Sequence, residues 1–289
     1  ELKLQLSQAY KQEETYWAQK ARCRWLREGD KNTAFFHARV KTRRQRNRLS
    51  CLQKEDGQWC ETEQEIEEEI CNFYKAVYTS SQPDDFEAVT EGVPCAVTLE
   101  MNAKLIKPVD EKEVKAALFS MHPDKAPGPD GMSPLFFQRY WNTCKNDIVM
   151  AIQSFLARGH LLKALNETIV TLIPKVEAPI NLSQYRPISL CNVVYRVIAK
   201  VLANRLKRVI PNCISPAQSA FVPGRHILDN VILAHELMHF LKNKRTGRNG
   251  FMTLKLDLSK ANDRVEWQFL GRMMKKMGFC PTWVRWILN

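Results

Sequence analysis

Several features that define common protein classes are missing from this sequence of 289 residues. No window approaches eighteen uninterrupted apolar residues, so we expect no transmembrane helix and no membrane partner. The first thirty residues are charged throughout and lack the apolar core of a signal peptide. The 11 glycines and 14 prolines are too few for a collagen-like or low-complexity chain. With 45% hydrophobic residues, the chain can instead bury one large core or two ordinary ones.

Disulfide and thiolate-zinc patterns are also missing. The 9 cysteines are odd in number, scattered, and never spaced as Cys-x-x-Cys. We therefore predict reduced thiols in an intracellular protein, nuclear or cytoplasmic and not secreted. The chain begins at Glu1 and ends in the apolar run 283–289, so we expect it to be a piece of a longer polypeptide.

Glycine-rich nucleotide loops and the hydrolase elbow G-x-S-x-G do not occur, but one metallopeptidase motif does. His235, Glu236 and His239 form an H-E-x-x-H sequence on a predicted helix. Two histidines four residues apart can share a zinc ion, with the glutamate as general base. No histidine follows His239 to complete the ligand set. A zinc peptidase is therefore a remote alternative, and we expect no zinc.

The net charge of +12 is distributed unevenly along the chain. Residues 1–50 carry 13 Lys and Arg against 5 Asp and Glu, whereas residues 51–100 carry 2 against 13. The basic run 41–48 holds five positive charges and no negative one, a density that suits binding to phosphates. Arg44, Arg46 and Arg48 are candidate contacts to a nucleic-acid backbone, and a solvated basic face is the alternative.

Local patterns predict an α+β protein that is predominantly helical. Residues 79–98 are polar and turn-rich and suggest a linker or surface loop, whereas 125–131 form a rigid Pro-Gly loop. A hairpin is expected over 49–59, a buried strand over 168–174 and a second strand over 251–258. Helices are expected over 1–48, 62–78 (with a Thr62/Glu65 capping box), 110–121 behind Asp110, 134–158, 195–210, 227–241, and from Ser259 to Gly278.

Asp257 is the residue most suggestive of chemistry. Met252, Leu254 and Leu256 alternate along the predicted strand, so Asp257 is expected to point to the opposite face at its end. A carboxylate in that position can hold Mg²⁺ when phosphates of a substrate complete the coordination. A surface aspartate at a strand end is the commoner alternative.

Four stretches, in this order, resemble the reverse transcriptases of non-LTR (long interspersed element) retrotransposons, particularly the plant-type elements. The head of the chain, around Trp25–His37, resembles the segment that links the family's endonuclease to its polymerase. The resemblance thus covers essentially the whole chain. The four stretches are KAPGPDG at 125–131, NLSQYRPISL at 181–190, QSAFVPGR at 218–225, and LKLDLSKA at 254–261 continuing through DRVEW at 263–267.

This resemblance implies the fingers and an incomplete palm of a right-hand polymerase over 99–289, C-terminally truncated. A helical N-terminal extension, with its basic and acidic linker, would occupy 1–98. The implied activity is RNA-directed DNA synthesis with dNTPs, an RNA template, a DNA primer or target, and Mg²⁺ or Mn²⁺. An endonuclease domain is expected upstream in the intact polyprotein.

The resemblance also implies residue roles. Asp257 would be the catalytic metal ligand, with the backbone carbonyl of Leu258 beside it. Lys175 and Arg186 would bind the triphosphate, and Asn262 stands where the family has a Tyr or Phe that excludes ribonucleotides. The residues near the template and nucleotide would be Lys125, Gln218, Phe221, Gly224 and Arg225.

The sequence departs from the family at its second metal-binding motif, because no aromatic-Ala-Asp-Asp turn occurs. The one Asp-Asp pair, at 84–85, lies upstream in the polar segment and in the wrong order. We therefore expect the chain to be inactive alone. A non-catalytic nucleic-acid-binding remnant is the alternative function.

Overall fold

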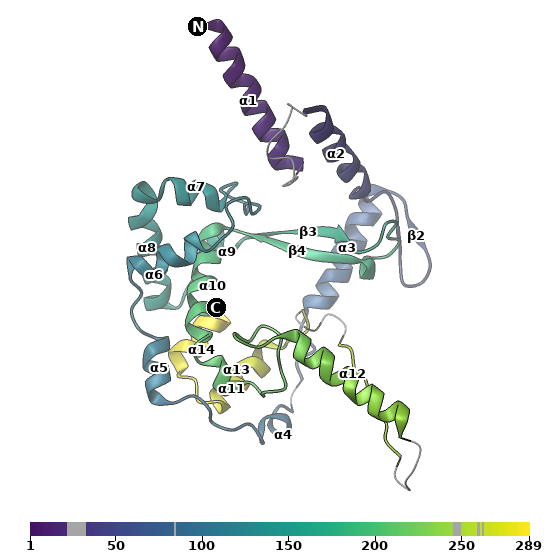
Figure 1. The fold of residues 1–289 in the computed structure, drawn as a ribbon, viewed down its shortest axis with the longest axis vertical. Coiled ribbons are helices and arrows are strands. Elements are labelled where there is room, and N and C mark those ends of the chain that lie inside the picture. Colours follow the sequence, from purple (N-terminus) through teal and green to yellow (C-terminus); the bar gives the residue numbers. More distant parts are fainter. Residues whose placement is uncertain (22–32, 84, 245–249, 259–260, 262) are drawn as a thin grey trace. The chain divides into compact units, whose positions relative to one another are not determined.

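The computed structural model describes residues 1–21, 33–83, 85–244, 250–258, 261 and 263–289 (Figure 1). Helices dominate these residues, and the strands form two separate two-stranded sheets, which confirms the predicted helix-rich α+β class. The chain divides into two compact units. Unit 1 joins residues 1–76 to 168–190, and unit 2 joins 77–167 to 191–289. No helix among the residues described has both the length and the apolar character needed to cross a membrane.

Unit 1 begins with two helices that pack against each other, α1 (Leu2–Ala21) and α2 (Thr33–Arg46). Phe36 and Val40 of α2 are buried with Ala21 of α1. The rings of Trp17 and His37 lie 3.6 Å apart between their centroids. The helical prediction for 1–48 is confirmed over both helices, and residues 22–32 lie outside the described part.

The predicted hairpin and capping box are both confirmed. β1 (Leu52–Gln53) pairs antiparallel with β2 (Trp59–Cys60), and Gly57 turns the chain between them with a φ of 88°. A left-handed φ of this kind favours glycine. α3 (Glu63–Tyr78) then starts with two reciprocal bonds. The Glu65 amide donates to Thr62 Oγ1 at 3.3 Å, and the Thr62 amide donates to Glu65 Oε2 at 3.2 Å.

The second sheet of unit 1 pairs β3 (Thr168–Pro174) with β4 (Tyr185–Cys191), joined through the short 3-10 helix η1 (Leu182–Gln184). The strand at 168–174 is confirmed, but its predicted burial is wrong. Ile169 and Val170 are 50% and 46% exposed, because the unit's hydrophobic cluster takes in only Leu172 from β3. The buried members of that cluster are Leu52, Cys60, Ile66, Leu182 and Tyr185.

Unit 2 is a group of helices around one apolar core. Asp110 accepts a 2.8 Å bond from the Glu113 amide and so caps the helix that begins at Glu111, as predicted. The core includes Val114, Leu118, Ile152, Val197, Val201 and Trp283. The helices are α4 (Glu87–Thr90), α5 (Leu99–Leu105), α6 (Glu111–Phe119), α7 (Pro134–Arg139), α8 (Trp141–Arg158), α9 (Lys163–Asn166), α10 (Val193–Leu206), α11 (Ile210–Cys213), α12 (Ile227–Asn243), α13 (Trp267–Lys276) and α14 (Pro281–Leu288).

Three predicted elements of unit 2 differ in extent. The helix over 134–158 is broken at Tyr140, and the helix over 195–210 ends at Leu206, with Pro211 in the first turn of α11. The last predicted helix starts at Trp267, not after position 259, which itself lies outside the described residues. It ends as predicted before Gly278, whose φ is 91°.

The polar segment 79–98, expected to be a linker or surface loop, is instead an integral part of unit 2. It contains α4, and Phe86 and Thr90 are buried. The Phe86 ring lies 5.8 Å from that of Phe269 on α13. The backbone amide of Val97 donates to the carbonyl of Met277 at 2.9 Å. Contacts with residues far along the chain, which composition does not reveal, give this segment its structure.

Candidate nucleotide and nucleic-acid sites

Asp257 lies in an exposed segment of unit 2. The predicted strand over 251–258 is wrong, because residues 250–258 contain neither helix nor strand. A strand exists through hydrogen bonds to a neighbouring strand, and the two sheets of the described chain do not include this segment. Met252 and Leu256, expected on a buried face, are 88% and 79% exposed. Asp257 is also exposed, so its carboxylate is accessible to solvent and ligands.

Asp257 can supply one ligand to a divalent ion, but the described residues around it do not complete a metal site. Within the described residues, no group of three or more His, Cys, Asp or Glu side chains could hold a metal. The next glutamate along the chain, Glu266, accepts hydrogen bonds from the Ser80 hydroxyl at 2.6 Å and from the Ser81 amide at 3.3 Å. Asn262 lies outside the described residues.

Lys175 and Arg186 belong to the β3–β4 sheet of unit 1, whereas Asp257 belongs to unit 2, and each is described within its own unit. The backbone amide of Lys175 donates to the carbonyl of Gln184 at 2.8 Å, which places Lys175 close to the start of β4. Its ammonium donates to the carbonyl of Ser183 at 2.7 Å. Arg186 is the second residue of β4 and is exposed. Two cations are thus presented near one end of a short β-ribbon.

The segment 214–225 in unit 2 forms a loop organised by Arg225. The guanidinium donates to the carbonyls of Ile214 and Gln218 at 3.2 and 2.6 Å, and also to that of Ser215. Gln218 and Phe221 are exposed, and Gly224 adopts a φ of 79°. The Arg225 side chain therefore buttresses the loop, and the other predicted residues remain on its surface.

The Pro-Gly loop over 125–131 is anchored on α10 and on the residue that precedes it. Asn192 is 2% exposed; its Oδ1 accepts from the Asp130 amide at 3.2 Å, and its amide donates to the carbonyl of Ala164 at 2.9 Å. Arg196 donates to the carbonyl of Ala126 at 2.9 Å. Lys125 is exposed at the start of this fixed loop. The rigidity predicted from Pro and Gly thus depends also on Asn192 and Arg196, to which we assigned no role from the sequence.

The basic run ends α2 in unit 1, and all three predicted arginines, at 44, 46 and 48, are exposed. Arg46 Nη2 lies 2.8 Å from Oε1 of Glu177, which follows β3 in the same unit. The side chains are 65% and 88% exposed, so the pair adds little to stability. It does place a carboxylate against one of the three candidate phosphate ligands, which the sequence did not suggest.

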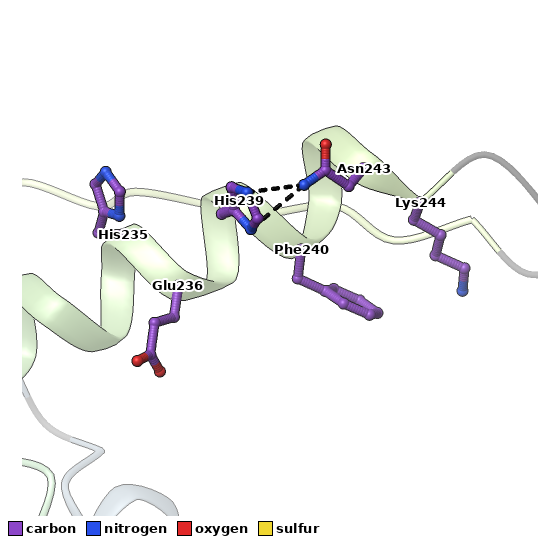
Figure 2. Close-up of a pocket in the computed structure, with 6 residues that line it drawn as sticks. All are labelled: His235, Glu236, His239, Phe240, Asn243 and Lys244. Carbon is purple, nitrogen blue, oxygen red and sulfur yellow. Dashed lines mark hydrogen bonds between the residues drawn. The ribbon is translucent and has the colours of Figure 1, made fainter.

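The H-E-x-x-H motif lies on α12, no residue of which is buried. Figure 2 shows the imidazoles of His235 and His239 on one side of the helix and the Glu236 carboxylate on the other. The Asn243 amide lies 2.9 Å from Nε2 of His239 (Figure 2). These residues line a shallow open pocket along the helix surface, together with Phe240 and Lys244. The described surroundings offer no third protein ligand for a zinc ion.

The sequence is similar to those of known proteins. A family profile described as "Reverse transcriptase (RNA-dependent DNA polymerase)" matches residues 173–289. The chain is 33% identical over 270 residues to the "Transposon TX1 uncharacterized 149 kDa protein" of Xenopus laevis, covering 93% of this chain and 20% of that protein. Residues 173–289 are part of a reverse transcriptase domain. The resemblance to non-LTR retrotransposon enzymes is thereby confirmed, and the plant-type subgroup stays a prediction.

Two further relatives are proteins of mobile elements in insects. Identity is 28% over 172 residues to the "Retrovirus-related Pol polyprotein from type-1 retrotransposable element R2" of Popillia japonica, covering 60% of this chain and 23% of that protein. It is 22% over 183 residues to the "RNA-directed DNA polymerase from mobile element jockey" of Drosophila funebris, covering 62% and 20%. The chain thus spans about a fifth of the length of these relatives.

Some of the predicted site residues lie inside the range that matches the reverse transcriptase family, and others lie before it. The matched range includes Lys175, Arg186, the loop 214–225 and Asp257. The arginines of the basic run and Lys125 lie before its first matched residue.

Proposed function

We propose that this chain is part of an RNA-directed DNA polymerase within a retrotransposon polyprotein. Residues 99–289 would supply the fingers and the first part of the palm, and residues 1–98 the N-terminal extension. The observation that carries the proposal is the family match over 173–289, within which Asp257 stands exposed on its segment. The relative from jockey, whose name states RNA-directed DNA polymerase, supports the same activity.

In this proposal Lys175 and Arg186 bind the triphosphate of the incoming dNTP. Both are exposed cations on one β-ribbon, and phosphoryl transfer needs positive groups against the phosphate oxygens. Arg186 can hold two oxygens at once through its planar guanidinium, whereas Lys175 acts as a point charge. The remaining substrates would be an RNA template and a DNA primer or target. An endonuclease domain would lie upstream in the intact polyprotein.

Asp257 and the carbonyl of Leu258 would hold Mg²⁺, or Mn²⁺ in its place. Carboxylate and carbonyl oxygens are the ligands these hard cations prefer. When bound, the ion supplies positive charge against the triphosphate. A single carboxylate does not complete the ligand set for two ions, and the sequence has no aromatic-Ala-Asp-Asp motif to add the others. We therefore propose that the 289-residue chain is inactive alone.

Primer extension tests this proposal. A DNA primer annealed to an RNA template is incubated with dNTPs and Mg²⁺, and we expect no extension by the 289-residue chain. A longer polypeptide that continues through an aromatic-Ala-Asp-Asp motif should extend the primer. Asp257→Ala should abolish that activity, while the control Asp229→Asn on exposed α12 should retain it. Extension that is unaffected by Asp257→Ala would contradict the assignment.

Asn262 is proposed to occupy the position that senses the sugar of the incoming nucleotide. A small amide cannot form the steric wall that a Tyr or Phe would provide there. In the longer polypeptide, Asn262→Tyr should therefore increase discrimination against ribonucleotides. Unchanged discrimination would show that position 262 does not contact the sugar.

A non-catalytic nucleic-acid-binding protein is the second candidate function. Its support is the exposed basic run of α2, which needs no metal to contact phosphates. This function predicts salt-dependent RNA or DNA binding by the 289-residue chain that survives Asp257→Ala. A zinc peptidase, the remote alternative, would instead require stoichiometric zinc that is lost in His239→Ala.

A further inference from the structure

The loop 214–225 is fixed at several points. Arg225 donates to three backbone carbonyls, of Ile214, Ser215 and Gln218. The side-chain amide of Asn230, on α12, donates to the carbonyl of Ala217 at 3.1 Å. Because both side chains act on consecutive parts of the backbone, the loop has a defined shape without belonging to a helix or strand.

Phe221 occupies an unusual position in this fixed loop. Its φ is 63°, in the left-handed region that bulky residues rarely adopt. Its two near neighbours Ser219 and Val222 are 7% and 6% exposed, whereas Phe221 itself is 97% exposed. The backbone thus holds an aromatic ring in solvent in a strained conformation, and no burial compensates the strain. Strain of this kind concentrates at sites that bind ligands.

The sequence around Phe221 suits a polyanionic ligand. No Asp or Glu occurs between Glu177 and Asp229, so a phosphate chain meets no acidic residue in that stretch. An exposed aromatic face binds the π-face of an unpaired base, and such stacking tolerates every base. In unit 2 the stretch carries the cations Arg196, Lys200, Lys207, Arg208 and Arg225, whereas its Arg205 is buried in an ion pair with Glu113.

We propose that Phe221 is a stacking platform for an unpaired base of a single-stranded nucleic acid, and that Arg225 is a positioning residue that holds the loop instead of binding phosphate. The inference rests on the proposed function for the class of its ligand. It adds a specific contact at a residue that resemblance places only near the template or nucleotide. It also changes the role of Arg225 from contacting the template or nucleotide to holding the loop, because its guanidinium donates to three backbone carbonyls.

Binding to a labelled 20-nucleotide single-stranded RNA tests the role of Phe221. Phe221→Ala and Phe221→Leu should each weaken binding by about 5- to 150-fold, because stacking needs a ring, whereas Phe221→Trp should retain it. The matched control is Phe251→Ala, which removes another exposed ring of unit 2 and should leave affinity unchanged. Full binding by Phe221→Leu would overturn the proposal, since it would show that hydrophobic contact is enough.

Phe221→Gly separates stacking from any loss of folding. Glycine adopts the left-handed region freely, so this variant should melt at a higher temperature than the wild type while binding the RNA as weakly as Phe221→Ala. Duplex RNA is the second control, because its bases are already stacked, and affinity for it should not change. A loss of equal size on duplex and single strand would overturn the proposal. Single-stranded DNA of the same sequence shows whether Phe221 contacts RNA, DNA or both. If Phe221→Ala weakens binding to neither single strand, the proposal is overturned.

The role of Arg225 is tested by the salt dependence of the same binding. If Arg225 only holds the loop, Arg225→Gln weakens binding without changing the slope of log K against log salt concentration. A phosphate ligand would instead lower the magnitude of the slope by about 0.7 for a single strand. The double variant Arg225→Gln/Phe221→Ala should bind no more weakly than Phe221→Ala alone. These measurements need no catalysis, so failure of primer extension leaves them informative.

Discussion

Arg205 of α10 and Glu113 of α6 form a two-bond ion pair in the interior of unit 2. Nε and Nη2 of the guanidinium donate to the two carboxylate oxygens at 2.8 and 2.7 Å. Nη1 donates to the carbonyl of Leu105, the last residue of α5, at 2.9 Å. The arginine side chain is 6% exposed. One side chain therefore joins three helices of the unit.

Removal of that arginine should be strongly destabilising. Arg205→Gln leaves the Glu113 carboxylate in a partly buried site without its partner, and we expect unfolding free energy to fall by about 3–5 kcal/mol. Urea denaturation followed by circular dichroism measures this change. The control is Lys104→Gln, which breaks an ion pair with Glu100 whose side chains are 67% and 78% exposed, and it should change stability by less than about 0.5 kcal/mol. Equal effects of the two variants would contradict the structural role of Arg205.

Gly128 packs directly against the residue that precedes α10. A Cβ at this position would clash with the backbone nitrogen and side-chain oxygen of Asn192, so Gly128→Ala must displace the Pro-Gly loop or the helix start. We expect a loss of about 1–3 kcal/mol in thermal or urea unfolding. Gly92→Ala is the matched control, because nothing lies within 4 Å of its added carbon and it should be nearly neutral. A neutral Gly128→Ala would show that the loop is not held tightly on Asn192.

Because Glu177 pairs with Arg46, we expect substitutions of Arg44 and of Glu177 to change RNA affinity in opposite directions. Arg44→Gln should weaken RNA binding and lower the magnitude of the salt slope by about 0.7–0.9, because one phosphate contact is lost. Glu177→Gln should instead strengthen binding, since it frees the Arg46 guanidinium and removes a negative charge. Fluorescence anisotropy over a series of salt concentrations measures both effects. Weaker binding by Glu177→Gln would mean that the pair positions Arg46 productively.

The capping box of α3 should make stability depend on pH. Backbone amides of Thr62 and Glu61 donate to the Glu65 carboxylate and hold its pKa below the usual value of 4.5. A depressed carboxyl pKa in the folded state gives stability that is present above the pKa of the unfolded chain and is lost as pH falls through the folded-state pKa. Glu65→Gln should therefore be less stable than the wild type at pH 7, and the difference should shrink below pH 4. A difference independent of pH would show that ionisation of Glu65 is not involved.

Local chemistry in the sequence predicted much of this fold. Thr62 and Glu65 start a helix through contacts within four residues, and Asp110 does the same for α6. Gly278 ends α13 with a left-handed φ of 91°, a conformation that favours glycine. Such signals depend on nearest neighbours along the chain, which a sequence displays directly.

Predictions that depended on distant partners were less accurate. Met252 and Leu256 alternate as in a strand, yet pairing with another strand is what makes one, and the residues described do not provide it. Phe86 is buried against Phe269, and the composition of its polar segment gave no sign of this contact. At the candidate site, the family motifs identified Arg225, but its use as a loop buttress follows from three carbonyl contacts that only coordinates display.

Unit 1 is discontinuous in sequence, and this affects the order in which it can be made. Leu52, Cys60 and Ile66 share their hydrophobic cluster with Leu182 and Tyr185, which a ribosome adds more than a hundred residues later. During synthesis the cluster residues Leu52, Cys60 and Ile66 cannot be fully covered until β4 has left the ribosomal exit tunnel. A nascent chain released before that point would lack two side chains of its own interior, and chaperones or proteases would have the first access to it.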